Sequence, residues 1–132
     1  ISNTLIKKME FHASLFYPNE CCGVIIGKED EAMDVWGFNN DSDGPKEKRY
    51  LIGPEQILEA ERRSSEMGLL ILGIYHSHPD VPAEPSKFDL DHAWPWYRYV
   101  IISVKNGKID QIRAWILDEN RRIFNLEEIK TA

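Results

Sequence analysis

The run from Leu69 to Tyr75 constrains the fold most, because it consists of apolar residues and one glycine. It follows Gly68, which predicts the end of a helix, and it is too short to be a buried helix itself. A strand that is apolar on both faces must be covered on both faces by other elements. The run therefore predicts the central strand of a sheet, and this strand delivers His76 at its end.

Hydrophobic periodicity predicts the elements around this strand. Apolar residues at helical spacing predict a helix over Thr4–Phe16, with Asn3 or Thr4 as its cap. Pro54 opens a second helix, Glu55–Met67. Short β-prone runs predict further strands at Cys21–Ile26, Ala32–Phe38, Tyr50–Ile52, Tyr97–Val104, Ile109–Leu117 and Arg121–Leu126. Helices interspersed with hairpins indicate an α+β fold, or an α/β fold with a mixed sheet, and 132 residues favour a single domain over 1–132.

The connections carry clear turn chemistry. Asn106-Gly107 between two strand patterns is a strong signal for a type I′ hairpin turn. Three prolines make Pro79–Pro85 a loop, and Ser86–Ala93 can then form a short helix that ends before Trp94 and Pro95.

Charge and composition exclude several classes of function. The net charge is −6, and no run of Lys or Arg is longer than two residues, which disfavours binding to nucleic acid. No stretch reaches the roughly 18 apolar residues of a membrane helix, and the first residues lack a signal-peptide pattern, so a cytoplasmic protein is expected. Cys21 and Cys22 are adjacent, and this spacing suits neither a disulfide framework nor a metal-binding pair. The two residues are therefore interpreted as small apolar residues of a strand.

The segment His76-Ser77-His78-Pro79 carries the chemistry, together with Asp89 in a second segment. On extended backbone, side chains two residues apart point to the same side about 6.5–7 Å apart, so both imidazoles can reach one ion while Ser77 points elsewhere. The proline-rich loop and a helical turn can return Asp89 to the same point. Two imidazole nitrogens and one carboxylate oxygen suit catalytic zinc, which keeps its fourth position for water.

Each of these residues also has an ordinary structural interpretation. His-x-His pairs occur at strand ends without a metal, and Ser86-x-x-Asp89 is close to a helix-capping box. A base is still needed beside the metal, and Glu20, just before a strand, is a candidate. The residues alone do not select Glu20 from the many acidic side chains.

The pattern His76-Ser77-His78-Pro79, six residues, then Ser86-x-x-Asp89 resembles the signature of the JAMM (MPN-plus) metalloproteases. Upstream, Asn19-Glu20-Cys21-Cys22-Gly23 resembles the segment that holds the catalytic glutamate of that family. This resemblance implies a zinc ion bound by His76, His78 and Asp89. It further implies that Glu20 is the acid/base and that Ser86 donates a hydrogen bond to the developing oxyanion.

The resemblance also implies a mixed sheet flanked by helices, similar to the cytidine deaminase fold. It implies hydrolysis of amide or isopeptide bonds at the Gly-Gly tail of ubiquitin-like proteins. The short chain is similar to the minimal prokaryotic type, which implies a sulfur-carrier protein of the ThiS or MoaD kind as substrate and partner. Two alternatives stay open: a peptidase acting on small or cell-wall peptides, and a non-catalytic MPN interaction module.

Several residues near the motif have two interpretations. Asp91 and His92 are expected on the surface of the short helix, with a place behind the ligands or against substrate as the alternative. Trp94 and Trp96 are expected in the core, with the wall of a cleft as the alternative. His12, on the first helix, is expected to be structural.

Overall fold

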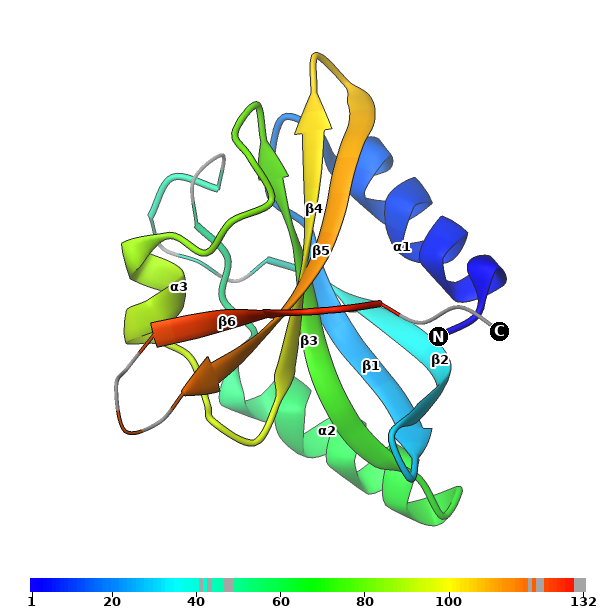
Figure 1. Ribbon diagram of the computed structural model, residues 1–132. Coiled ribbons are helices and arrows are strands. Elements are labelled where there is room, and N and C mark those ends of the chain that lie inside the picture. The colour runs from blue at the N-terminus through cyan, green and yellow to red at the C-terminus, as the bar shows by residue number, and fades with distance from the viewer. Residues whose placement is uncertain (41, 43, 47–48, 119, 121–122, 130–132) are drawn as a thin grey trace.

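A computed structural model of the protein describes residues 1–40, 42, 44–46, 49–118, 120 and 123–129. The described residues form three helices around one six-stranded sheet (Figure 1). The helices are α1 (Asn3–Phe16), α2 (Pro54–Glu66) and α3 (Lys87–Asp91). The strands are β1 (Cys22–Lys28), β2 (Glu31–Phe38), β3 (Leu70–Pro79), β4 (Arg98–Lys105), β5 (Lys108–Asp118) and β6 (Ile123–Glu127).

The sheet has the strand order β2-β1-β3-β4-β5-β6, in which only β3 and β4 run parallel. The apolar run therefore forms an interior strand, as predicted, and the mixed sheet confirms the α+β class. At the β4–β5 turn Asn106 has a φ of 51° and Gly107 a φ of 81°, the two positive values that a type I′ turn requires. The Asn-Gly prediction is confirmed.

Successive residues of the interior strands pack on opposite faces of the sheet. One core cluster joins Leu5, Met9 and Ala13 of α1 to residues such as Tyr75. The other joins Ala60 of α2 and the α3 region to residues such as Ile74. Figure 1 shows α1 on one side of the sheet and α2 on the other. Because side chains alternate along β3, His76 and His78 fall on the face of α2 and α3.

Three expectations about the elements need correction. Tyr50–Ile52 is not a strand, since the N–H of Leu51 donates to the side chain of Asn40 rather than to a neighbouring strand. Helix α1 is capped by Ser2, whose Oγ accepts from Leu5, and not by Asn3 or Thr4. His76 does not end its strand, because pairing with β4 continues to Pro79. The last strand is described over Ile123–Glu127, and its predicted start at Arg121 lies outside the described residues.

None of the described helices has both the length and the apolar character needed to span a bilayer. Cys21 and Cys22 are buried thiols in and beside β1, as their interpretation as small apolar residues predicts.

Candidate metal centre

The two histidines are held by the interior of the sheet. His76 is paired with Cys22 of β1 on one side and with Ile101 of β4 on the other. His76 is completely buried and His78 is 4% exposed. Between them, Ser77 points to the opposite face, where its Oγ accepts a hydrogen bond from the N–H of Cys21. Strand alternation thus places both imidazoles on one face, as the spacing predicts.

Asp89 reaches the same point from α3. Ser86 caps this helix: its Oγ accepts from the N–H of Asp89 at 3.0 Å, while its own N–H donates to Asp89 Oδ2 at 2.9 Å. This is the capping box that the sequence predicts. The reciprocal bonds fix the direction of the carboxyl group, which is buried against β3.

Three potential ligand atoms form a nearly equilateral triangle. His76 Nε2 and His78 Nε2 lie 3.1 Å apart, and Asp89 Oδ2 lies 3.2 Å from the first and 3.0 Å from the second. In a tetrahedral zinc site with bonds of about 2.0–2.1 Å, neighbouring ligand atoms are roughly 3.3 Å apart. The three atoms therefore have the size and shape of one face of such a tetrahedron.

The protonation of His78 also suits a metal ligand. Its Nδ1 lies 3.0 Å from the carbonyl oxygen of Pro82, and because a carbonyl can only accept, Nδ1 must carry a proton. In the neutral ring the lone pair is then on Nε2, which faces the triangle. Nδ1 of His76 has no hydrogen-bond partner among the described residues.

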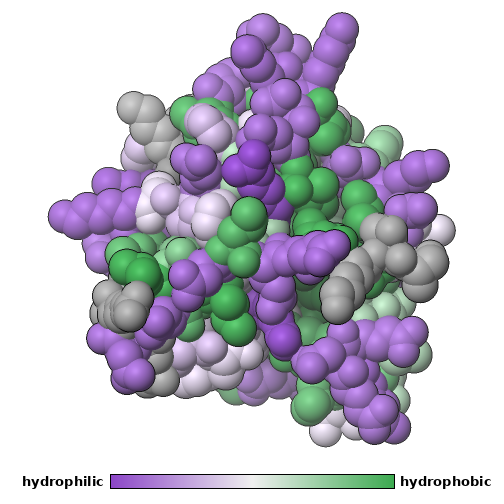
Figure 2. Space-filling view, in the orientation of Figure 1, coloured by the Kyte–Doolittle hydropathy of each residue, from purple (hydrophilic) through white to green (hydrophobic). Residues whose placement is uncertain are grey.

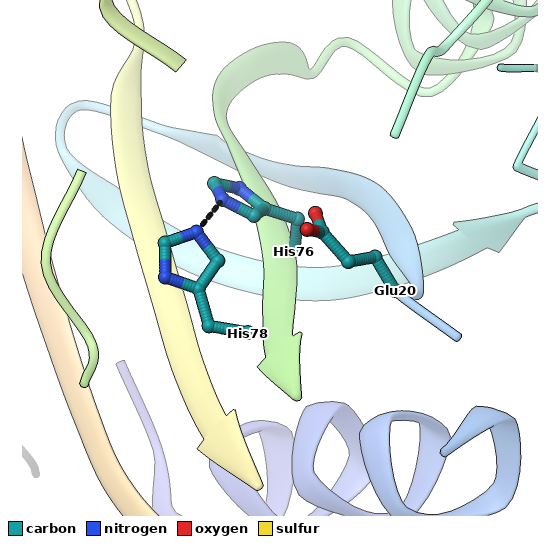
Figure 3. A group of neighbouring side chains, drawn as sticks. All are labelled: Glu20, His76 and His78. Atoms are coloured by element: carbon teal, nitrogen blue, oxygen red, sulfur yellow. Dashed lines mark hydrogen bonds between the residues drawn. The ribbon is translucent and has the colours of Figure 1, made fainter. Parts of the chain in front are cut away.

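Glu20 completes the cluster from the segment just before β1. Its carboxyl oxygen and the ring nitrogens of His76 and His78 all lie within 4.8 Å of one another, and Figure 3 shows the carboxyl group directed toward His76. The residue is 3% exposed, and its Oε1 has no hydrogen-bond partner in the described part of the chain. Burial and the charge of Asp89 raise the pKa of Glu20 to about 9.

These residues fit a metal ion on three counts. Two carboxyl groups and two imidazoles are buried together, and polar groups of this kind are stable in an interior only when paired or metal-bound. Burial lowers the pKa of His76, which favours the neutral ring that a metal requires. Burial alone would raise the pKa of Asp89, but the adjacent side chains of His76 and His78 lower it well below its usual range. The Oε1 atom of Glu20, which has no hydrogen-bond partner among the described residues, lies beside this set.

An apolar cavity of about 550 Å³ adjoins the centre, and Tyr50 and Asp89 are in its wall. Trp94 and Trp96 also line it, 52% and 64% exposed, with their rings stacked 5.2 Å apart. The expectation that Trp94 and Trp96 lie in the core was wrong. Both rings instead form part of the cavity wall, where they lie among apolar residues and are partly open to solvent. Figure 2 shows hydrophobic surface at the left of the view, where α3 lies in Figure 1.

The remaining predicted residues lie outside the ligand triangle. His92 is exposed, donates from Nδ1 to the carbonyl of Phe88 and lines the cavity, while Asp91 is exposed on α3. His12 Nδ1 lies 2.8 Å from the hydroxyl of Tyr75 on the α1 face, in a structural contact. Sequence reasoning missed Tyr50, whose ring stacks on His76, since no local pattern marks it.

Comparison with known proteins shows the family and the fold of the chain. Residues 2–118 match the family model described as prokaryotic homologs of the JAB domain. A JAB1/MPN domain protein from Archaeoglobus fulgidus has the same fold, with a TM-score of 0.66 and 17% identity over 99% of this chain and 96% of that one.

Three curated relatives are similar over most of their length. A desampylase from Pyrococcus furiosus is 35% identical, over 82% of this chain and 74% of its own. A probable TtuB-protein conjugate cleaving protease from Thermus thermophilus is 38% identical, over 90% and 76%. A CysO-cysteine peptidase from Mycobacterium tuberculosis is 29% identical, over 84% and 77%. By the extent of the family match and by these identities, the chain belongs to the prokaryotic homologues of the JAB domain.

Proposed function

We propose that this protein is a zinc-dependent hydrolase that cuts an amide or isopeptide bond at the Gly-Gly terminus of a ubiquitin-like or sulfur-carrier protein. The observation that carries the proposal is the buried triangle of two Nε2 atoms and one Oδ2 atom, with the Glu20 carboxyl beside it. The names of the relatives support the substrate class, since one is named a probable TtuB-protein conjugate cleaving protease and another a CysO-cysteine peptidase. A ThiS- or MoaD-like carrier is therefore the partner to test.

In the proposed mechanism, His76, His78 and Asp89 would hold the ion. When bound, zinc would polarise the scissile carbonyl and lower the pKa of a bound water molecule to about 7. Glu20 takes a proton from the attacking water as the C–O bond forms, and it then gives this proton to the leaving amine nitrogen as the C–N bond breaks. Its buried position beside the ligand atoms supports this role.

Ser86 is proposed to stabilise the oxyanion. Its Oγ accepts one hydrogen bond from Asp89, which leaves the hydroxyl proton to donate. The side chain is exposed at the start of α3, where a substrate can reach it. Capping and catalysis are compatible, because the hydroxyl oxygen accepts the hydrogen bond of the cap while the hydroxyl proton donates to the oxyanion.

Glu20→Gln tests the function directly. The amide keeps the shape of the side chain but cannot accept the proton, so zinc content is expected to stay at the wild-type level while hydrolysis falls roughly 10²–10⁴-fold. The substrate is a ThiS-like carrier whose Gly-Gly terminus is joined by an amide bond to a reporter protein. Cleavage is followed by mass spectrometry with zinc measured in the same samples.

The substrate panel separates the alternatives. A matched fusion with Ala-Ala in place of Gly-Gly is expected to stay intact, as are short peptides. Equal cleavage of short peptides would favour the small-peptide peptidase, and wild-type protein that cuts nothing would favour a non-catalytic module. A Glu20→Gln protein with the wild-type rate would remove Glu20 from the mechanism.

A further inference from the structure

His76 differs from the other ligands in how its side chain is held. A metal-binding histidine usually donates its other ring N–H to an acceptor, which fixes the orientation of the ring. His78 does so through Pro82, and Asp89 is fixed by Ser86. The Nδ1 atom of His76 is buried and has no such acceptor among the residues that the structure describes. Another contact must therefore orient this ring.

Tyr50 provides that contact. Its ring lies nearly parallel to the imidazole of His76, with an angle of 18° between the planes and 4.2 Å between the centroids. The sheet holds the backbone of His76 through β1 and β4, but strand pairing does not by itself fix the rotation about the side-chain bonds. A parallel ring at van der Waals distance restricts this rotation, because tilting the imidazole would drive it into the tyrosine.

Tyr50 is in turn fixed by a buried amide. Asn40 donates from Nδ2 to the carbonyl of Arg49 at 2.8 Å and accepts at Oδ1 from the N–H of Leu51 at 3.1 Å, so it holds the residues on both sides of Tyr50. The same Nδ2 donates to the carbonyl of Glu20 at 3.2 Å. One side chain, 7% exposed, thus joins the tyrosine segment to the segment that carries the proposed acid/base.

We propose that Tyr50, held by Asn40, is a positioning residue that orients His76 for metal binding. The ring takes the place of the hydrogen bond that fixes each of the other two ligands, which is Nδ1–H to Pro82 for His78 and the N–H of Ser86 to Oδ2 for Asp89. This inference rests on the proposed zinc centre and concerns the aromatic face, not the hydroxyl group. Tyr50→Phe is therefore expected to behave like the wild type, whereas residues without a planar ring are expected to bind metal more weakly.

The test compares Tyr50→Phe, Tyr50→Leu and Tyr50→Met with the wild type. Zinc affinity is measured by competition with a chelator, and the geometry of the centre by the visible absorption of the cobalt-substituted protein. Loss of contacts behind a metal ligand weakens affinity roughly 10–100-fold, and we expect this for Leu and Met with a changed cobalt spectrum. Methionine is unbranched and more flexible than leucine, so it can adapt to the space left by the ring and covers the case in which leucine impairs folding.

Trp94→Leu is the matched control, because it removes an aromatic ring from the same cavity without touching His76. It is expected to keep wild-type affinity and the wild-type spectrum. Wild-type affinity and an unchanged spectrum in Tyr50→Leu or Tyr50→Met would overturn the inference while leaving the proposed function intact. A wild-type protein that binds no zinc would instead overturn the proposed function.

Discussion

At the scale of single residues, Ser86 and Asp89 connect ordinary helix capping to the candidate centre. Asp89 Oδ2 accepts from the backbone of Ser86 at 2.9 Å and also lies 3.0 Å from His78 Nε2. The backbone N–H of residue 86 remains when serine is replaced by alanine or glycine. The position of Asp89 therefore depends only partly on the Ser86 hydroxyl. Substitutions of Ser86 can therefore separate the cap from the proposed oxyanion donor.

Ser86→Ala is expected to keep zinc and lose turnover. Loss of an oxyanion donor costs about 2.7–4 kcal/mol in the transition state, or roughly 10²–10³-fold in kcat. Loss of the cap costs about 1 kcal/mol of folding stability, whereas Ser86→Gly loses only a few tenths. Both variants are expected to have the same low kcat despite different melting temperatures. Normal turnover in either one would leave Ser86 as a helix cap alone.

The acidity of Glu20 predicts a pH effect on the metal-free protein. Burial and the charge of Asp89 raise its pKa from 4.5 to about 9. The folded state therefore favours the protonated carboxyl: its contribution to stability is complete below pH 4.5 and is lost as the pH rises toward about 9.

Urea unfolding at a series of pH values checks this effect against metal-free Glu20→Gln, which cannot titrate at this position. Relative to that variant, the wild type is expected to lose at most about 1.4 kcal/mol per pH unit between pH 5 and pH 9. Parallel curves for the two proteins would show that Glu20 is ionised in the folded state.

At the scale of elements, the parallel pair β3–β4 sets the position of the histidines. A Cβ atom on Gly73 would lie 2.5 Å from the carbonyl oxygen of Arg98, so only glycine permits this approach. His76 and His78 follow on the same strand, paired with Ile101 and Ser103. A displacement of β3 from β4 would therefore move both histidines.

Gly73→Ala is expected to lower stability by about 1–3 kcal/mol, as overpacking usually does, and to weaken zinc binding as well. Gly68→Ala is the control: Gly68 has a φ of +72° and open space around a Cβ, so alanine there strains only the backbone, by about 1–2 kcal/mol. Chemical denaturation and chelator competition measure the two properties. Equal zinc affinity in both variants would show that the β3–β4 spacing does not control the centre.

At the scale of the whole molecule, the sheet and helix α3 bring together segments that are distant in the sequence. Glu20 precedes β1, the histidines come from β3 and Asp89 comes from α3. All four side chains are buried. Without an ion, removing these polar groups from water costs free energy of folding. An ion that binds only this arrangement stabilises the fold by mass action.

Zinc is therefore expected to raise the melting temperature. At a free concentration 100 times Kd, the gain is about 2.7 kcal/mol, or roughly 8–13 °C for a chain of this size. Elemental analysis is expected to find one zinc per chain, and His78→Ala combined with Asp89→Ala is expected to lose both the zinc and the shift. Stoichiometric zinc in that double variant would place the metal elsewhere.

Local chemistry is what the sequence by itself determined. Strand alternation puts His76 and His78 on one face, a capping box places Asp89, and Asn106-Gly107 specifies its turn without distant contacts. Periodicity likewise indicates α1, α2 and the buried β3, because each depends on residues close together in the chain.

Only the tertiary structure decided which distant side chains meet the histidines. The antiparallel β1–β3 pairing brings Cys22 opposite His76, with Glu20 just beyond, although sequence alone gave Glu20 no preference over other carboxylates. Tyr50 looked like part of a strand, and Trp94 looked like a core residue. Their actual places follow from the hydrogen bonds of Asn40 and from the cavity beside α3. Such contacts depend on which side chains of the assembled sheet and helices are still uncovered. These side chains come from distant parts of the chain, so no local sequence pattern encodes the contacts.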